Sequence, residues 1–251
     1  MTAAAFKRSI RDLQVWCSSC MVAFAGHDPI GVLIGAKRPS ATLIHKIAVR
    51  PDNLRQGHGR HLLTSLSSKL AILGPPRIIA EVSEAVAAAS GLFAACGYVE
   101  EAHLTDYVGT LSVRSASRTG FVIPVTVDDL AANGLLGDPQ SPVCWERSLE
   151  TLTARKGDIA GLAVASDERI EAYILYIVRG NEGTEIVSLR TLVDDGGSRI
   201  HELFVHLRTR GPETFRIPKV HPAEIPGQLL ETLGLEPTQQ YGLYATKARP
   251  G

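Results

Sequence analysis

A short run of glycine, arginine and histidine residues carries the clearest chemical signal in this 251-residue sequence, Arg55-Gln56-Gly57-His58-Gly59-Arg60. Glycine has no Cβ, so a phosphate can approach its backbone amide closely. The first turn of a helix offers amides without intrahelical partners and a partial positive charge. A helix that begins here would therefore bind an anion such as a pyrophosphate, with Arg55 and Arg60 at the rim. The alternative is an ordinary turn between a strand and a helix, because a short glycine motif is weak evidence alone.

The flanking segments predict the strand and the helix that such a loop needs. Thr42 to Val49 is β-branched and apolar, as in a buried strand. After the glycines, leucines recur at helical spacing and form one apolar stripe: Leu62, Leu63, Leu66, Leu70 and Leu73. Gly74-Pro75-Pro76 then ends the helix.

This strand, loop and helix closely resemble motif A of the GNAT superfamily of N-acyltransferases. The motif is R/Q-x-x-G-x-G/A after a strand that ends in apolar-Ala-Val. Here Ile47-Ala48-Val49 is followed by Leu54-Arg55-Gln56-Gly57-His58-Gly59, in which Leu54 departs from the motif's first position. Arg77 to Val82 resembles the family's fifth strand, and Glu84 to Cys96 followed by Gly97-Tyr98 resembles its last helix and Gly-aromatic ending. The resemblance covers roughly residues 20–110.

The resemblance implies acetyl-CoA as cosubstrate and names the backbone that binds it. The pyrophosphate would lie on the loop formed by Arg55, Gln56, Gly57, His58, Gly59 and Arg60. The pantetheine arm would add, like another strand, to the backbone at Ile47, Ala48 and Val49. No metal is implied.

Two residues are candidates for the base that takes the proton of an attacking amine. His45 lies two residues before Ile47, on the same face of a regular strand, and its ordinary pKa suits a base near neutral pH. It also resembles a histidine of arylalkylamine N-acetyltransferases. Glu81 lies in an otherwise apolar strand, where burial would raise the pKa of its carboxyl. For each residue the alternative is a structural or solvent-facing role.

The family's general acid is missing from its usual position. Many members carry a tyrosine four residues before the glycine of the Gly-aromatic pair, where this sequence has Phe93, and an asparagine seven residues earlier, where it has Val86. A phenyl ring cannot donate a proton. Tyr98 and Tyr107 are substitutes, although both fit ordinary aromatic packing.

Composition excludes several function classes. The chain is 45% hydrophobic and 21% charged with a formal net charge of zero, as in a soluble globular protein. Zero net charge gives no support for nucleic-acid or anionic-membrane binding, no apolar run reaches the length of a membrane span, and the N-terminus lacks a signal peptide. We therefore expect a cytoplasmic protein.

Cys17 and Cys20 form a lone C-x-x-C without a second pair, which favours incidental buried cysteines over a metal site or a redox function.

The second half of the sequence reads as a copy of the first with its chemistry eroded. Its predicted hairpin is Ile159 to Ala165 and Ile170 to Val178, and Gly234 follows Gly97 by about 137 residues. Asp194 and Asp195 stand where a pyrophosphate would sit, and like charges would repel it. We expect domains at 1–114 and 120–251, joined by the linker Ser115 to Gly120.

The sequence thus predicts an α+β protein of two GNAT-like domains, each a mostly antiparallel sheet flanked by helices, with a splayed pair of strands that binds CoA. Only about 20 residues precede the first hairpin, fewer than the family usually has there. The expected activity is transfer of an acetyl group from acetyl-CoA to a primary amine of a small molecule or peptide, and a homodimer is compatible with it. The alternatives are a non-catalytic acyl-CoA-binding or sensing protein and a structural partner without CoA affinity.

Overall fold

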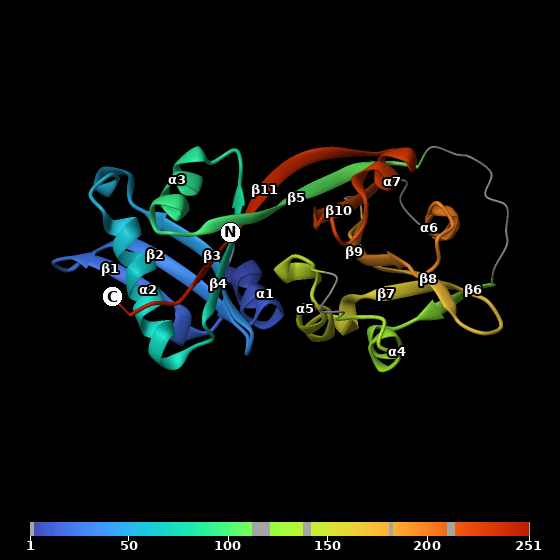
Figure 1. The fold of residues 1–251 in the computed structure, drawn as a ribbon, viewed down its shortest axis with the longest axis horizontal. Helices are drawn as coiled ribbons and strands as arrows, with labels where there is room; N and C mark the ends of the chain where they lie inside the picture. Colours follow the sequence, from blue (N-terminus) through green and yellow to red (C-terminus); the bar gives the residue numbers. More distant parts are fainter. Residues whose placement is uncertain (1–2, 112–120, 138–141, 181–182, 210–213, 251) are drawn as a thin grey trace. The chain divides into compact units, whose positions relative to one another are not determined.

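The chain forms two compact units of mixed α+β structure (Figure 1). The computed structural model describes residues 3–111, 121–137, 142–180, 183–209 and 214–250. Unit 1 comprises Met1–His103 and Tyr241–Gly251, and unit 2 comprises Leu104–Gln240. These ranges differ from the expected domains at 1–114 and 120–251. The expected linker, Ser115 to Gly120, lies outside the described residues.

Unit 1 is built on a sheet with the strand order β1-β2-β3-β4-β11. Its helices and strands are α1 (Ala3–Leu13), β1 (Met21–Ala25), β2 (Asp28–Lys37), β3 (Ala41–Val49), α2 (His58–Leu73), β4 (Arg77–Ser83), α3 (Ala87–Ala95) and the later part of β11 (Leu235–Lys247). One buried cluster joins α2 and α3 to the sheet.

Unit 2 is built on a sheet with the strand order β5-β10-β9-β8-β7-β6. Its helices and strands are the later part of β5 (Val99–Thr110), β6 (Phe121–Val125), α4 (Val127–Ala132), α5 (Leu149–Ala154), β7 (Ala160–Ala165), β8 (Ile170–Val178), β9 (Thr184–Thr191), α6 (Ser198–Arg208), β10 (Thr214–Val220) and α7 (Gly227–Thr232). Separate buried clusters lie on α6 and α7 and on α4 and α5.

Each unit completes its sheet with a strand from the far side of the sequence. In unit 1, β11 pairs antiparallel with β4, and Lys247 is opposite Arg77. In unit 2, β5 pairs antiparallel with β10, and Thr110 is opposite Thr214. The same offset of 137 residues takes Arg77 to Thr214 and Thr110 to Lys247, so the repeat seen in the sequence extends to the strand pairing. The sequence places β11 in the second domain, whereas its pairing with β4 places Tyr241 to Lys247 in unit 1.

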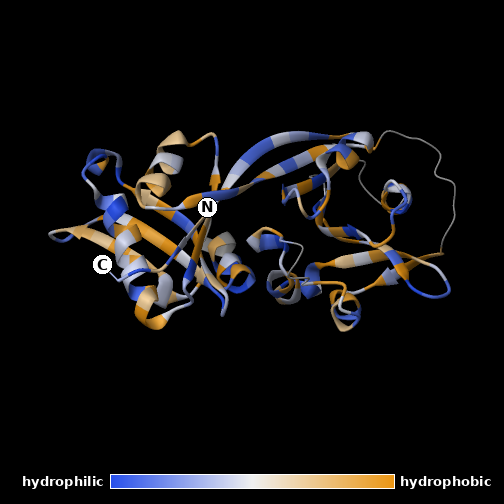
Figure 2. Ribbon diagram, in the orientation of Figure 1, coloured by the Kyte–Doolittle hydropathy of each residue, from blue (hydrophilic) through white to orange (hydrophobic). Residues whose placement is uncertain are grey.

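Strand β11 shows this change of unit in its side chains. Glu236 to Gln240 are exposed and hydrophilic, and the strand is largely blue over this part in Figure 2. Leu243, Tyr244 and Ala245 are buried, and Tyr244 stacks on Phe93 of α3 with ring centroids 6.1 Å apart. The apolar part of the strand therefore belongs to the core of unit 1.

Helix α2 forms where the leucine stripe predicts it. Leu62, Leu63, Leu66 and Leu70 are buried in the cluster beneath it. Leu73 was expected in the same stripe but is 71% exposed, because the last turn extends beyond that cluster.

The predicted α+β fold with helices flanking a mostly antiparallel sheet is confirmed. Among the described residues, no helix is long and apolar enough to cross a membrane.

Candidate acyl-CoA site

Strands β3 and β4 create a gap because they run side by side only at their beginnings. Ala41 to Ile44 pair in parallel with Arg77 to Ala80, and the pairing stops there. Beyond that point β3 continues to Val49 beside β2, while β4 continues to Ser83 beside β11. From His45 onward, β3 therefore has one edge that no described strand covers. Such an edge offers backbone donors and acceptors to a ligand.

A β-bulge marks the start of this gap. Ile44 and Lys46 pair with consecutive residues of β2, so His45 is the extra residue of the bulge. His45 is half-buried, Lys46 is exposed, and half-buried Ile47 packs against the cluster beneath α2. A bulge re-aims the side chains around it, which the regular alternation assumed from the sequence did not include.

The loop before α2 has the backbone conformation that an anion site needs. Gly57 is the N-cap of α2 with φ of 86° and ψ of −2°, and no side chain caps the helix. Arg55 also has a positive φ, of 63°. The amide of His61 donates to the carbonyl oxygen of Gly57 at 2.9 Å and starts the helical hydrogen bonds. The preceding amides of the first turn have no carbonyl within the helix to which they could donate.

Helix α3 faces this loop with small side chains and leaves a pocket of about 680 Å³. From α3 the pocket is lined by Ala87, Ala88, Gly91, Leu92 and Ala95. From β3, the loop and α2 it is lined by Val49, Asn53, Leu54, Arg55, Gly57, His58, Gly59 and Arg60. Gly59 is needed for the close approach of the two helices, because a Cβ there would lie 3.0 Å from Leu92 Cδ2. A pocket of this size accommodates a small-molecule ligand.

The charges around the pocket favour an anion. Arg55 and Arg60 line it together with the N-terminal end of α2, whose dipole is positive there. Cys96, which follows α3, is close enough to Arg60 for a hydrogen bond. Burial raises the pKa of the Cys96 thiol, and the charge of Arg60 offsets part of that rise. At neutral pH Cys96 is therefore a neutral thiol, not a nucleophile.

Most of the residues expected to bind acetyl-CoA line this pocket, but not all of them do. Val49, Arg55, Gly57, His58, Gly59 and Arg60 are among its walls, whereas Ile47, Ala48 and Gln56 are not. The side-chain amide of Gln56 instead donates to the carbonyl oxygen of Asp52 at 3.2 Å. The residues of α3 that line the pocket were not among those predicted from the sequence. The signal that could have identified them is the spacing of small residues along Ala87 to Ala95, which places Ala87, Gly91 and Ala95 on one helical face.

The two base candidates lie outside the pocket walls. Glu81 alternates along β4 with Ala80 and Val82, which point into the cluster beneath the helices, so its half-buried side chain points to the opposite face of the sheet. His45 precedes Ile47, which packs on the helix side. The structure therefore does not bring Glu81 to the helix side of the sheet, where the pocket lies.

The aromatic residues near α3 are packing residues in this structure. Phe93 is 2% exposed and meets Tyr98 edge-on, with ring centroids 5.1 Å apart. Burial raises the pKa of the Tyr98 hydroxyl above its usual range. Tyr107 belongs to unit 2 and to its core cluster. Val86 is exposed just before α3. None of these four residues is among the walls of the pocket.

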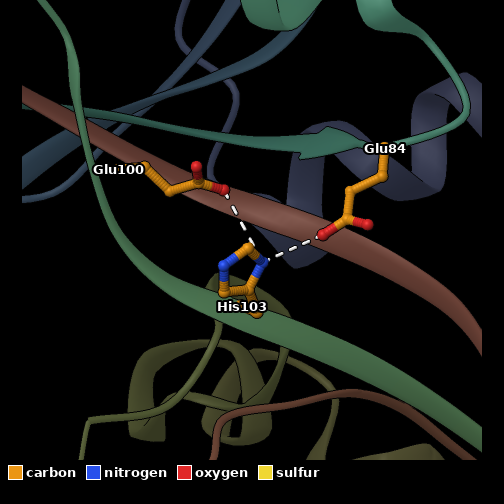
Figure 3. A group of neighbouring side chains, drawn as sticks. All are labelled: Glu84, Glu100 and His103. Atoms are coloured by element: carbon orange, nitrogen blue, oxygen red, sulfur yellow. Dashed lines mark hydrogen bonds and ion pairs between the residues drawn. The ribbon is translucent and has the colours of Figure 1, made fainter.

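Away from the pocket, Glu84, Glu100 and His103 gather where β4 ends and β5 begins (Figure 3). His103 Nδ1 lies 2.9 Å from an oxygen of Glu84 and 3.7 Å from one of Glu100, and all three residues are exposed. This is a surface ion-pair cluster. The cysteines take no part in it: Cys17 is exposed, contrary to the expectation that it is buried, and Cys20 Sγ donates to the carbonyl oxygen of Trp16 at 3.3 Å.

The comparisons with known proteins agree with this geometry. The model of the acetyltransferase (GNAT) family matches residues 3–98. A tandem GNAT protein from the clavulanic acid biosynthesis pathway is similar in structure, with 14% identity, a TM-score of 0.62, and coverage of 96% of this chain and 87% of that one. A GCN5-related N-acetyltransferase from Sphaerobacter thermophilus is similar with 14% identity and a TM-score of 0.65, and the match covers 92% of this chain and 81% of that one. An acetyltransferase from Pyrococcus horikoshii is similar with 17% identity and a TM-score of 0.62, and the match covers 98% of this chain and 78% of that one. No curated protein matches the chain by sequence.

Residues 3–98 thus match the model of the GNAT acetyltransferase family, and the chain as a whole has the fold of a tandem GNAT protein. Family and fold together support acyl transfer as the general chemistry.

Proposed function

We propose that unit 1 binds acetyl-CoA and transfers its acetyl group to a primary amine of a small molecule or peptide. The observation that carries this proposal is the pocket in which the α2 N-terminus, Arg55 and Arg60 meet the small-residue face of α3, beside the uncovered edge of β3. The pyrophosphate would lie on the amides at Gly57 to Arg60, and the pantetheine arm along β3 at Ile47 to Val49. A cytoplasmic location is part of the proposal and rests on the sequence alone.

The chemistry needs little from the protein beyond positioning. The amine nitrogen attacks the thioester carbonyl, the carbon–nitrogen bond forms, and the carbon–sulfur bond breaks. The amine loses a proton to a base and the departing thiolate gains one. Holding the two reactants together supplies much of the rate, and backbone amides can stabilise the charge on the carbonyl oxygen.

His45 is the base that this proposal favours. It lies at the bulge where β3 leaves β4, so it is at the end of the gap that a thioester would reach. Glu81 lies on β4 and points away from α2 and α3, and it would serve only an acceptor that enters from that face. The thiolate has no tyrosine at Phe93 to protonate it, so water is the proton source in this proposal.

Thermal unfolding with and without acetyl-CoA tests the proposal. A ligand at 100 times its Kd adds about 2.7 kcal/mol to stability. Wild type should show this stabilisation and Gly57→Asp should not, because a side chain there would extend into open space over the phosphate loop. Gly134→Asp is the matched control, since Gly134 has φ of 67° and open space around it but lies in unit 2. Equal stabilisation of Gly57→Asp and wild type would contradict the assignment.

An amine panel then separates the enzyme from the alternatives. Acetyl transfer to any amine supports the proposal, whereas CoA binding without transfer supports a sensing or binding protein. Absence of both supports a structural partner. His45→Ala should lower kcat and remove the limb of the pH–rate profile near neutrality; an unchanged profile would move the role of base to Glu81.

A further inference from the structure

Unit 2 repeats the glycine N-cap of the phosphate loop with a different occupant. Gly197 is the N-cap of α6 with φ of 85° and ψ of 11°, nearly the values of Gly57. The residue two positions before the glycine is Arg55 in unit 1 and Asp195 in unit 2. In unit 2 the Asp195 carboxylate accepts hydrogen bonds from the amides of Gly197, at 2.9 Å, and Arg199, at 2.8 Å. A carboxylate of the chain itself thus holds amides that could otherwise bind a phosphate.

The gap between β9 and β10 is also occupied. The two strands pair in parallel at Thr184 and Glu185 of β9 only. The next residue, Ile186, accepts a hydrogen bond on its carbonyl oxygen from Arg147 Nη1 at 2.8 Å. Arg147 Nε donates to both oxygens of Glu224, at 3.0 and 2.9 Å, and the two side chains are 1% and 5% exposed. This ion pair lies at the point where the strands separate, and it lines a pocket of about 300 Å³, less than half the volume of the pocket in unit 1.

The helix wall has changed in the same sense. The 137-residue offset makes Glu224 the counterpart of Ala87, and Leu229 the counterpart of Leu92. Ala87, which leaves room in unit 1, is therefore replaced in unit 2 by the partner of Arg147. Leu229 packs directly on the N-cap glycine, because a Cβ on Gly197 would lie 2.1 Å from Leu229 Cδ1, whereas a Cβ on its counterpart Gly57 would have no atom within 4 Å.

We propose that unit 2 retains the shape of a CoA cleft but fills it with its own side chains, the Asp195 carboxylate in the phosphate position and the Arg147–Glu224 pair where the strands part. The chain then binds one CoA per molecule, in unit 1. The stoichiometry rests on the proposed function of unit 1, whereas the filling of unit 2 does not.

Isothermal titration of the full chain with CoA tests the stoichiometry. Wild type should bind one equivalent and Gly57→Asp none. Two equivalents in wild type, or one remaining in Gly57→Asp, would overturn the inference and leave an acyl-CoA protein. No binding by wild type would contradict the proposed function instead, and the next experiment would still decide whether unit 2 is filled.

Asp195→Ala tests the internal carboxylate without CoA. Loss of a side chain that holds helix N-terminal amides should lower Tm by about 2–6 °C, and inorganic phosphate should restore most of that loss by binding the vacated amides. Asp194→Ala is the control, because Asp194 is the adjacent aspartate and is exposed. Chloride at equal ionic strength controls for salt. An unchanged Tm overturns the proposal, and so does a lowered Tm that phosphate fails to restore. Asp195→Asn, which keeps one acceptor oxygen, should lie between wild type and Asp195→Ala.

Discussion

The two units share a left-handed glycine at the start of a helix and differ in what can bind there. Both helices start at a glycine in the left-handed conformation, Gly57 in unit 1 and Gly197 in unit 2. In unit 1 arginines and small residues surround the helix start and a pocket remains. In unit 2 a carboxylate binds the amides at the helix start, and a buried ion pair lies where the strands separate, beside a smaller pocket of about 300 Å³. The comparison teaches that the backbone of a cofactor site can persist after side chains of the protein have occupied the ligand position. Glycine spacing alone therefore does not identify a working site.

The largest effect should come from removing Tyr241 to Gly251. Unit 1 would lose the strand that pairs with β4 and the Tyr244 ring that packs on Phe93, while unit 2 keeps all of its strands. We expect unit 1 to be digested in limited proteolysis and unit 2 to resist. Removing only Arg249 to Gly251 is the control because the β4–β11 ladder stays complete. Tyr244→Ala is the milder variant, with a loss of about 3–5 kcal/mol. Two resistant units in the longer truncation would show that unit 1 does not depend on β11.

Breaking the ion pair of unit 2 should come next. Glu224→Gln leaves the Arg147 guanidinium buried without its counter-charge, which typically costs about 3–5 kcal/mol. Urea denaturation should show the loss, and acetyl-CoA binding by unit 1 should be unchanged. The double variant Arg147→Met with Glu224→Leu should recover much of the stability, because it leaves no uncompensated charge. A single variant as stable as wild type would mean that the pair is not important for closing unit 2.

The comparison can be sharpened by giving unit 1 the residue of unit 2. Arg55→Asp places a carboxylate two residues before Gly57, as in unit 2, and Arg55 already has the positive φ that aspartate tolerates better than most residues. A carboxylate that binds the same amides should weaken CoA binding at least about tenfold, roughly 1.4 kcal/mol, by titration calorimetry. Arg55→Gln separates loss of the positive charge from gain of the negative one. Equal effects of the two variants would show that no internal carboxylate has formed.

The smallest effect concerns pH and His221, the unit 2 counterpart of Glu84. Burial lowers the pKa of His221, with the charge of Glu224 opposing that shift, and its Nδ1 accepts a hydrogen bond from the amide of Ala223 at 3.0 Å. The unfolded chain, with a pKa of about 6.5, therefore takes up the proton first. Neutral His221 therefore contributes to the free energy of unfolding at pH values above about 6.5, and this contribution is lost as the pH falls below that value. Denaturation of wild type and His221→Gln at several pH values should show a steeper acid loss in wild type; parallel curves would exclude this origin.

The sequence predicts the parts of this molecule that depend on local order. The strand Thr42 to Val49, the glycine loop and the leucine helix are all consecutive, and each lies where the pattern puts it. The eroded second loop was also readable, because Asp194 and Asp195 replace the expected residues. The predicted Glu84 to Cys96 helix begins only at Ala87, because the turn that follows β4 takes its first residues.

Features that depend on distant partners could not be read in the same way. The exchange of β5 and β11 joins strands far apart in sequence, and nothing local in Leu235 to Lys247 says which strand it pairs with. The bulge at His45 is set by the register with β2. The Arg147–Glu224 pair joins a short turn to a segment after β10, and neither residue has a sequence context that reveals the other.

The strand exchange also governs the order in which the protein can be made. Strand β4 leaves the ribosome well before Tyr241 to Lys247, the segment that pairs with it. Unit 1 must therefore wait, with one edge of its sheet unpaired, until translation of the whole second half is complete. Unit 2 needs nothing beyond Gln240 and can fold first. We therefore expect the N-terminal unit to complete its sheet after unit 2, the reverse of the usual N-to-C order, and a chaperone that shields exposed strand edges would meet it during that interval.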